Sequence, residues 1–199
     1  RNVLQESARI ARGAVKPLAE LDASDYDALL IPGGFGAAKN LSSFGFKGAD
    51  MEVENDVVDV LRDFKSKDRV IGLTCIAPII AAKVFGNEGV KLTLGGSGEN
   101  FPYSGSIDAA KSFGAEIEEM DVNGVCIDWN NKLITTPAYM QGDVSPHAIY
   151  DGIQRFLRRV NSVVVQQEVV QQSKSATAKA AEEALKSASC DEMMMKLIN

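Results

Sequence analysis

Two short apolar runs, each closed by a turn sequence, constrain the fold of this chain more than any other feature. Residues 26–31 are followed by Pro32-Gly33-Gly34, and residues 69–73 are followed by Thr74-Cys75. Both runs have the length and composition of buried strands. The segment between them places apolar residues at helical spacing, namely Val57, Val60, Leu61 and Phe64. A strand, a helix and a strand in succession require a right-handed parallel crossover, so the pattern predicts an α/β fold.

The later sequence continues this alternation. We expect helices at residues 77–85 and 107–113, the first opened by Pro78 and the second ended by Gly114. Strands are expected at residues 116–120, 124–129 and 132–135, the last two joined as an antiparallel hairpin at Asn130-Asn131. A helix then begins at Ser145-Pro146, with a buried stripe of Ile149, Ile153, Phe156 and Val160. Residues 1–160 are therefore expected to form one α/β domain, with a mostly parallel sheet and a late antiparallel addition.

Residues 161–199 differ in composition, being rich in Val, Gln, Ala, Ser, Lys and Glu. Helix propensity is high in this extension and apolar periodicity is weak. Two interpretations are open: a frayed or disordered extension, or a helix that docks on a partner chain.

Composition limits the classes of function. The 199 residues carry a net charge of -6 and no basic run, which argues against a nucleic-acid partner. No apolar run approaches the roughly 20 residues of a transmembrane helix. Three widely spaced cysteines, Cys75, Cys126 and Cys190, suit reduced thiols in a reducing compartment better than a disulfide framework. The chain opens at Arg1 rather than Met, which is compatible with a preceding segment that this sequence lacks.

Cys75 is the candidate nucleophile. A residue in a sharp turn between a strand and a helix lies at the carboxyl edge of the sheet, where ligands of open α/β folds bind. Backbone N–H groups and the helix dipole at such a turn favour thiolate, so we expect the Cys75 pKa to fall below its free value of about 8.5. The alternative is a small buried core thiol.

The glycine hinge supplies a second part of the predicted site. Gly33 and Gly34 allow a bare N–H group to approach a ligand at the neighbouring strand end. One N–H from this hinge and one from Ile76 would make an oxyanion hole for an adduct on Cys75. The alternative is a simple turn.

The remaining candidate residues give weaker indications of a function. His147, the single histidine, opens the last helix and is either a catalytic base or a capping or surface residue. We expect Cys126 to pack in a strand and Cys190 to have no role. One histidine without a close cysteine pair predicts no metal site.

At these hinges the sequence resembles the ElbB-like family, of the ThiJ/PfpI group of class I glutamine-amidotransferase-like proteins. The resemblance runs to about Val160 and rests on three motifs: Pro32-Gly33-Gly34-Phe35-Gly36, Gly72-Leu73-Thr74-Cys75-Ile76-Ala77-Pro78 and Thr135-Thr136-Pro137-Ala138-Tyr139-Met140. It implies a doubly wound, mostly parallel, flavodoxin-like sheet with helices on both faces, whose first strand and helix precede Arg1. It also implies that Cys75 is the nucleophile and that the amides of Gly34 and Ile76 face the oxyanion.

The function implied by this resemblance is a cysteine-dependent glyoxalase-like conversion of small dicarbonyls that needs no cofactor and no metal. The motifs Phe101-Pro102-Tyr103-Ser104-Gly105 and His147-Ala148-Ile149-Tyr150 resemble the eukaryotic mitochondrial branch, which implies the mitochondrial matrix, with the cytoplasm as the alternative.

Departures from the family pattern keep other functions open. The family's acidic residue beside the cysteine would precede Arg1. Glutaminase activity is not expected, because Thr136-Pro137-Ala138 replaces the His-Pro-Glu element of related glutaminases. The alternatives are a non-catalytic subunit of a mitochondrial complex, or homodimer, held through the extension, and a thiol redox sensor that uses Cys75.

Overall fold

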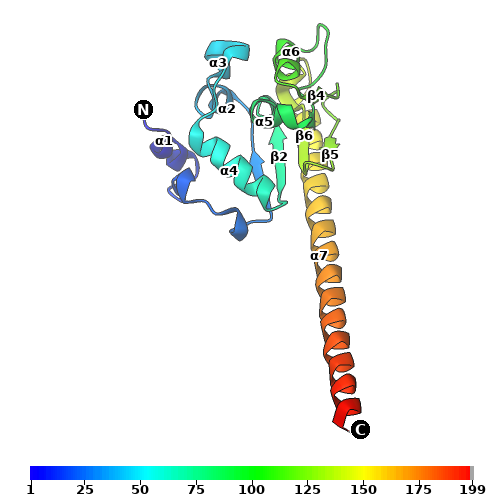
Figure 1. The fold of residues 1–199 in the computed structure, drawn as a ribbon. Coiled ribbons are helices and arrows are strands. Elements are labelled where there is room, and N and C mark those ends of the chain that lie inside the picture. The colour runs from blue at the N-terminus through cyan, green and yellow to red at the C-terminus, as the bar shows by residue number, and fades with distance from the viewer. Residues whose placement is uncertain (198–199) are drawn as a thin grey trace. The chain divides into compact units, whose positions relative to one another are not determined.

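The computed structural model describes the backbone of residues 1–197 and the side chains of residues 1–179. It divides the chain into two compact units, Arg1–Asn161 and Ser162–Asn199. The second unit is the C-terminal part of helix α7, Pro146–Leu197. All other helices and strands belong to the first unit (Figure 1).

The central sheet of the first unit has the strand order β1-β2-β6-β5. Its strands are β1 (Ala28–Ile31), β2 (Val70–Thr74), β5 (Cys126–Asp128) and β6 (Leu133–Thr136). The first two strands and β6 run parallel, and β5 is antiparallel to β6. The parallel crossover and the late antiparallel hairpin are therefore confirmed.

Helices cover both faces of this sheet, as the sequence predicted. On β2, Ile71 and Leu73 point into the main core with α4 (Asn55–Ser66) and α5 (Pro78–Phe85). Successive strand residues face opposite sides, so Gly72 faces the other layer. There an added Cβ would lie 2.8 Å from the ring of Phe156 in α7. Gly72 thus lets α7 pack directly on the sheet.

Smaller elements complete the unit. They are α1 (Val3–Ile10), α2 (Phe35–Lys39), α3 (Phe44–Lys47), α6 (Gly105–Ser112), and the strands β3 (Lys91–Leu92) and β4 (Glu116–Ile117), which pair in parallel. The sequence missed β3 and the first three helices, which are short or, in α1, bury no residue. It also predicted β4 through residue 120, whereas the strand ends at Ile117.

The β5–β6 hairpin is wider than the predicted two-residue turn at Asn130-Asn131. Both strands end short of that pair, and the left-handed residue is Lys132, with φ 54°. The cause is Asp128, whose buried carboxylate accepts from the backbone N–H groups of Asn130 and Asn131, at 3.1 and 3.0 Å. The hydrogen bonds between the Asp128 carboxylate and the N–H groups that follow it replace the tight turn.

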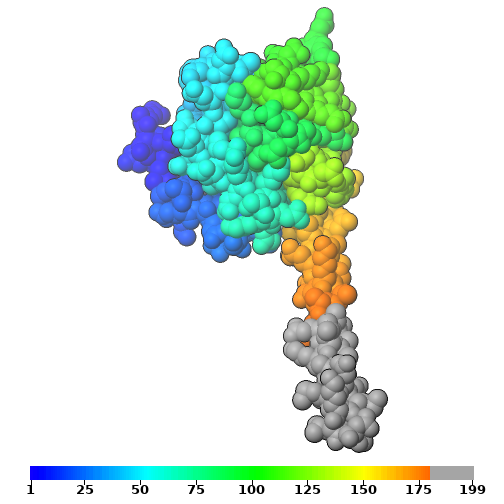
Figure 2. All heavy atoms as spheres, viewed as in Figure 1, coloured from blue at the N-terminus to red at the C-terminus, as the bar shows by residue number. Residues whose placement is uncertain are grey.

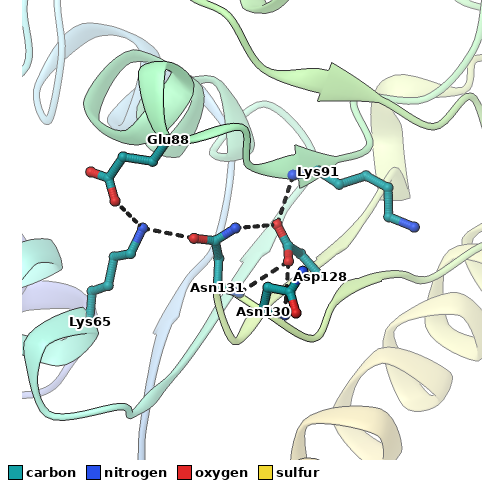
Figure 3. Close-up of polar contacts among 6 residues, drawn as sticks. All are labelled: Lys65, Glu88, Lys91, Asp128, Asn130 and Asn131. Carbon is teal, nitrogen blue, oxygen red and sulfur yellow. Dashed lines mark hydrogen bonds and ion pairs between the residues drawn. The ribbon is translucent and has the colours of Figure 1, made fainter.

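Asp128 is also the centre of a polar network at the amino ends of the parallel strands (Figure 3). Its carboxylate accepts from the Lys91 N–H at 2.8 Å and from the Asn131 side chain at 2.7 Å. Lys65 of α4 donates to Asn131 at 2.8 Å and pairs with Glu88. Burial by itself raises the pKa of Asp128, but the hydrogen bonds from Lys91, Asn131 and Asn130 outweigh it and hold the pKa below its usual value.

Candidate active site

Cys75 occupies a strained turn between β2 and α5. Its φ is 59°, in the left-handed region that a residue with a Cβ rarely adopts. The turn is fixed on both sides, since the Cys75 N–H donates to the Thr136 carbonyl at 3.0 Å and the Ala77 N–H donates to the Thr74 carbonyl at 3.1 Å. Pro78 then begins α5. The predicted strand-to-helix elbow is therefore present.

The glycine hinge after β1 packs against this elbow. A Cβ added to Gly33 would lie 2.5 Å from the Cys75 Cβ and 2.6 Å from the Thr74 carbonyl oxygen, closer than real atoms approach. Position 33 thus requires glycine because a Cβ would clash with the elbow. Position 34 requires glycine because its φ of 90° is unfavourable for residues with a Cβ. Together they let the end of β1 touch the turn after β2.

Three backbone N–H groups lie near the Cys75 thiol. They belong to Ile76, Gly34 and Tyr139, and each favours the thiolate and so lowers the pKa of the thiol. The structure thus brings together the three residues that the sequence selected, Cys75, Gly34 and Ile76. It adds a third donor, Tyr139, from the segment after β6. Tyr139 lies in the Thr135–Met140 motif, which the sequence analysis noted without predicting a role for any of its residues.

The predicted direction of the Cys75 pKa shift is wrong in this structure. Burial of the thiol is the largest influence and raises its pKa, and the three N–H groups only partly offset it. The sequence argument counted the donors and the helix dipole, but a strand-end pattern cannot show how completely other segments cover the sulfur.

The other cysteines have different settings. Cys126 is 1% exposed in β5, as expected of a packing residue, and its sulfur lies 3.4 Å from the Glu118 carboxylate. Burial and that carboxylate raise the Cys126 pKa to about 12. Cys190 lies beyond the residues whose side chains are described.

His147 is a surface residue. Its side chain is 83% exposed and lies 3.7 Å from Asp151, one turn along α7. Ser145 caps this helix through the Ala148 N–H at 3.2 Å. Of the two interpretations of His147, the structure favours the surface one.

A pocket of about 770 Å³ opens over Cys75. Its walls come from α2, from α3, from the start of α6 and from residues 139–144. Figure 2 shows two of these segments, α3 in cyan and α6 in green, on the same face of the first unit. Apart from Cys75, the titratable lining residues are Tyr103, Tyr139 and Asp143, so Asp143 is the one carboxylate among the lining residues that the structure describes.

Asp143 adjoins Val144, which packs against the same apolar cluster as Cys75. Val144 and Cys75 both contact the small apolar cluster of Val122, Ala138 and Ile149. The Gly142 N–H donates to the Asn100 carbonyl at 2.7 Å, which ties this segment to the loop before α6. Asp143 itself is exposed and has a φ of 53°. A carboxylate in a strained backbone position thus stands at the pocket wall.

Among the residues that the structure describes, no group of three or more His, Cys, Asp or Glu side chains could hold a metal ion. None of the helices in the described part of the chain is both long and apolar enough to cross a membrane.

Known proteins were compared with this chain. No protein-family model matches it. Glutamine amidotransferase-like class 1 domain-containing protein 3, mitochondrial, of Homo sapiens is 47% identical over 163 residues, which cover 80% of this chain and 60% of that protein. ES1 protein, mitochondrial, of Danio rerio is 34% identical over 171 residues, covering 80% of this chain and 63% of that protein. This chain thus spans less than two thirds of the length of these relatives.

A solved structure agrees with these relatives. The crystal structure of an isoprenoid biosynthesis protein with an amidotransferase-like domain from Ehrlichia Chaffeensis has a TM-score of 0.69 and 28% identity, and the match covers 81% of this chain and 71% of that one. The chain is thus similar to class I glutamine amidotransferase-like proteins, which agrees with the resemblance at its two hinges. It is also similar to the mitochondrial ES1 proteins of Rattus norvegicus and Danio rerio.

Proposed function

We propose that this protein is a cysteine-dependent enzyme that converts small dicarbonyls to hydroxy acids, with Cys75 as nucleophile. The observation that carries the proposal is the set of three N–H groups, from Ile76, Gly34 and Tyr139, around a sulfur in an open pocket. A packing thiol needs no such donors, whereas an oxyanion on an adduct of that thiol does.

The reaction begins when the Cys75 thiolate attacks the aldehyde carbon of the dicarbonyl. A C–S bond forms, the carbonyl electrons move to oxygen, and the N–H groups stabilise the resulting oxyanion. A base then removes the proton from the former aldehyde carbon, and that proton or its equivalent returns to the neighbouring carbonyl carbon. The product is a hydroxy-acyl thioester on Cys75. One carbon is oxidised and its neighbour reduced, so no external oxidant is needed.

Asp143 is assigned the proton transfer, because it is the one carboxylate among the described residues that line the pocket. Water then hydrolyses the thioester, which releases the hydroxy acid and regenerates the thiol. The sum is dicarbonyl plus water to hydroxy acid.

The test is conversion of glyoxal to glycolate, followed by proton NMR, with the purified protein and a Cys75→Ser variant. Equimolar glycolate formed by the wild-type chain and absent with Cys75→Ser supports the proposal. Equal rates with both proteins, or none with either, overturn it. In D2O, glycolate with carbon-bound deuterium would show that the proton passes through an exchanging base.

One observation favours a second candidate function. The raised Cys75 pKa reduces the thiolate fraction at neutral pH, which suits a non-catalytic subunit of a larger assembly better than an enzyme or a thiol sensor. The exposed Val165 and Val169 of the second unit offer apolar surface to such a partner. Absence of glycolate formation, together with co-purification of the chain in a defined complex that is lost when residues 162–199 are removed, would support this candidate.

The proposed location is the mitochondrion, which is supported by the mitochondrial names of relatives from Homo sapiens, Rattus norvegicus and Danio rerio. The matrix side is part of the proposal, and those names do not specify it. Fractionation of cells that express the tagged full-length protein tests it.

A further inference from the structure

The pocket over Cys75 has an aromatic rim that glyoxal chemistry alone does not need. Four aromatic side chains line the pocket: Phe35, Phe44, Tyr103 and Tyr139. Three of them are largely exposed, Phe35 at 71%, Tyr103 at 55% and Tyr139 at 59%. Exposed aromatic rings clustered around one concave site are typical of a binding surface. Each ring is in contact with water, and a ligand that covers it gains the free energy of burying apolar surface.

Two of these rings are tied to the groups that face the sulfur. The N–H of Tyr139 itself lowers the Cys75 pKa, and Phe35 directly follows Gly34, whose N–H does the same, so both backbone groups lie near the thiol. The rings of Phe35 and Tyr139 therefore belong to residues that carry, or directly follow, an N–H group near a ligand bonded to the sulfur. The ring of Phe35 is also held in place, since the Lys39 ammonium lies 4.7 Å from its centroid.

The third exposed ring, that of Tyr103, comes from a different segment of the pocket lining. Tyr103 precedes α6, in the loop where Phe101 packs against Gly95 and Gly96. An added Cβ on either glycine would lie 3.0–3.1 Å from the Phe101 ring, so this loop is closely packed beneath its exposed tyrosine. The rim is thus built on fixed segments, which reduces the entropy lost on binding.

The size of the pocket agrees with the composition of its rim. About 770 Å³ lies in the range of roughly 300–1,000 Å³ that holds drug-sized ligands, whereas glyoxal fills only a small part of such a space. Its lining is mainly apolar and aromatic, and Asp143 is the one charged side chain among the described lining residues. The unfilled remainder therefore suits an uncharged apolar group.

We propose that this site acts on α-oxo aldehydes that carry a large apolar, preferably aromatic, substituent, in preference to glyoxal itself. This inference rests on the proposed function. The reaction is unchanged: the Cys75 sulfur bonds to the aldehyde carbon, and the substituent on the neighbouring carbonyl lies among Phe35, Tyr103 and Tyr139.

Turnover gives the first test. We expect kcat/KM for phenylglyoxal to exceed that for glyoxal by at least about tenfold, because only phenylglyoxal removes an aromatic group from water when it binds. Tyr103→Ala should lower this ratio by about fivefold and Tyr103→Phe should retain it. The matched control is Tyr150→Ala, a tyrosine of similar exposure, 59%, on α7 and outside the pocket. Equal kcat/KM values for the two aldehydes overturn the inference and leave the proposed function standing.

A second test does not depend on turnover. Phenacyl chloride and chloroacetone are matched chloroketones that differ in the aromatic ring, and their rates of Cys75 alkylation are measured by mass spectrometry relative to their rates with the unfolded chain. We expect the folded protein to favour phenacyl chloride, and Tyr103→Ala, but not Tyr150→Ala, to lose that preference. No preference overturns the inference. A clear preference without turnover of either aldehyde overturns the proposed function while supporting an aromatic pocket.

Discussion

The two ends of the central sheet are built on opposite physical principles. At the amino ends of its parallel strands, the buried Asp128 carboxylate accepts from backbone and side-chain donors around it, and Lys65 and Glu88 extend the network to neighbouring elements (Figure 3). At the carboxyl ends, Cys75 has a left-handed backbone conformation, and backbone N–H groups lie near its thiol in an open pocket. Satisfied polar groups stabilise the amino end, and a strained cysteine with backbone donors beside it defines the carboxyl end.

The first way to sharpen this comparison is Asp143→Asn, at the carboxyl end. If Asp143 moves the proton, glycolate formation should fall by about 100-fold or more while the fold is kept, because a positioned acid–base group contributes about that factor. Turnover by NMR measures the effect, and Cys75 alkylation checks that the pocket remains open. Asp108→Asn, exposed on α6 and outside the pocket, is the control. Unchanged turnover would remove Asp143 from the mechanism.

Gly33→Ala should damage the same end through its backbone. The new Cβ meets the Cys75 Cβ and the Thr74 carbonyl, neither of which is a flexible side-chain end. We expect a loss of about 2–3 kcal/mol in the free energy of unfolding, by urea titration, together with impaired Cys75 chemistry. Gly36→Ala is the control, since nothing lies within 4 Å of its added Cβ. Equal stability of the two variants would refute the close approach.

Asp128→Ala should instead damage the amino end alone. Removal of the carboxylate leaves the Lys91 and Asn131 donors without their partner, at a cost of about 2 kcal/mol in the free energy of unfolding. Cys75 alkylation by phenacyl chloride should keep its wild-type rate. Asp59→Ala, an exposed residue of α4, serves as the matched control. A change in the alkylation rate for Asp128→Ala would show that the two ends are coupled.

A smaller effect is expected from pH, which should change the contribution of Asp128 at the amino end to the free energy of unfolding. Because the folded pKa of Asp128 lies below the value of about 3.9 in the unfolded chain, its contribution is complete above about pH 4. It is lost as the pH falls through the folded pKa. Urea titrations at several pH values should therefore show a steeper loss of stability below pH 4 in the wild type than in Asp128→Asn. Parallel curves would contradict the lowered pKa.

The smallest expected effect concerns Cys75 itself. Burial raises its pKa, so its alkylation rate should reach half its maximum above pH 8.5, the ordinary value being about 8.5. Cys126, with a pKa of about 12, should stay unlabelled in the folded protein. Mass spectrometry of digests measures both sites, with Cys75→Ser as the blank. A Cys75 midpoint below pH 8 would restore the direction predicted from the sequence and favour the enzyme and sensor interpretations over the subunit.

Local patterns were enough to predict much of this protein. The apolar runs, the helical stripe ending at Phe64, the cap at Ser145 and the helix start at Pro78 are all where the sequence indicated. Each depends on residues a few positions apart, where periodicity and capping preference act directly. The sequence also selected Cys75, Gly34 and Ile76, because a strand-to-helix turn and a glycine hinge require particular residue types.

Only the tertiary structure decided what surrounds those residues. The third N–H comes from Tyr139, more than 60 positions along the chain from Cys75, and the aromatic rim gathers rings from three separate segments. Likewise Asp128 widened the hairpin that its neighbours had suggested. Such contacts form between segments whose local patterns do not refer to one another.

The Cys75 pKa shows the same division most clearly. The sequence determined the N–H donors of the turn, which lower that pKa, but burial raises it and is the larger effect. Desolvation depends on every segment packed over the sulfur, so it is a property of the assembled fold and not of the turn that carries the cysteine.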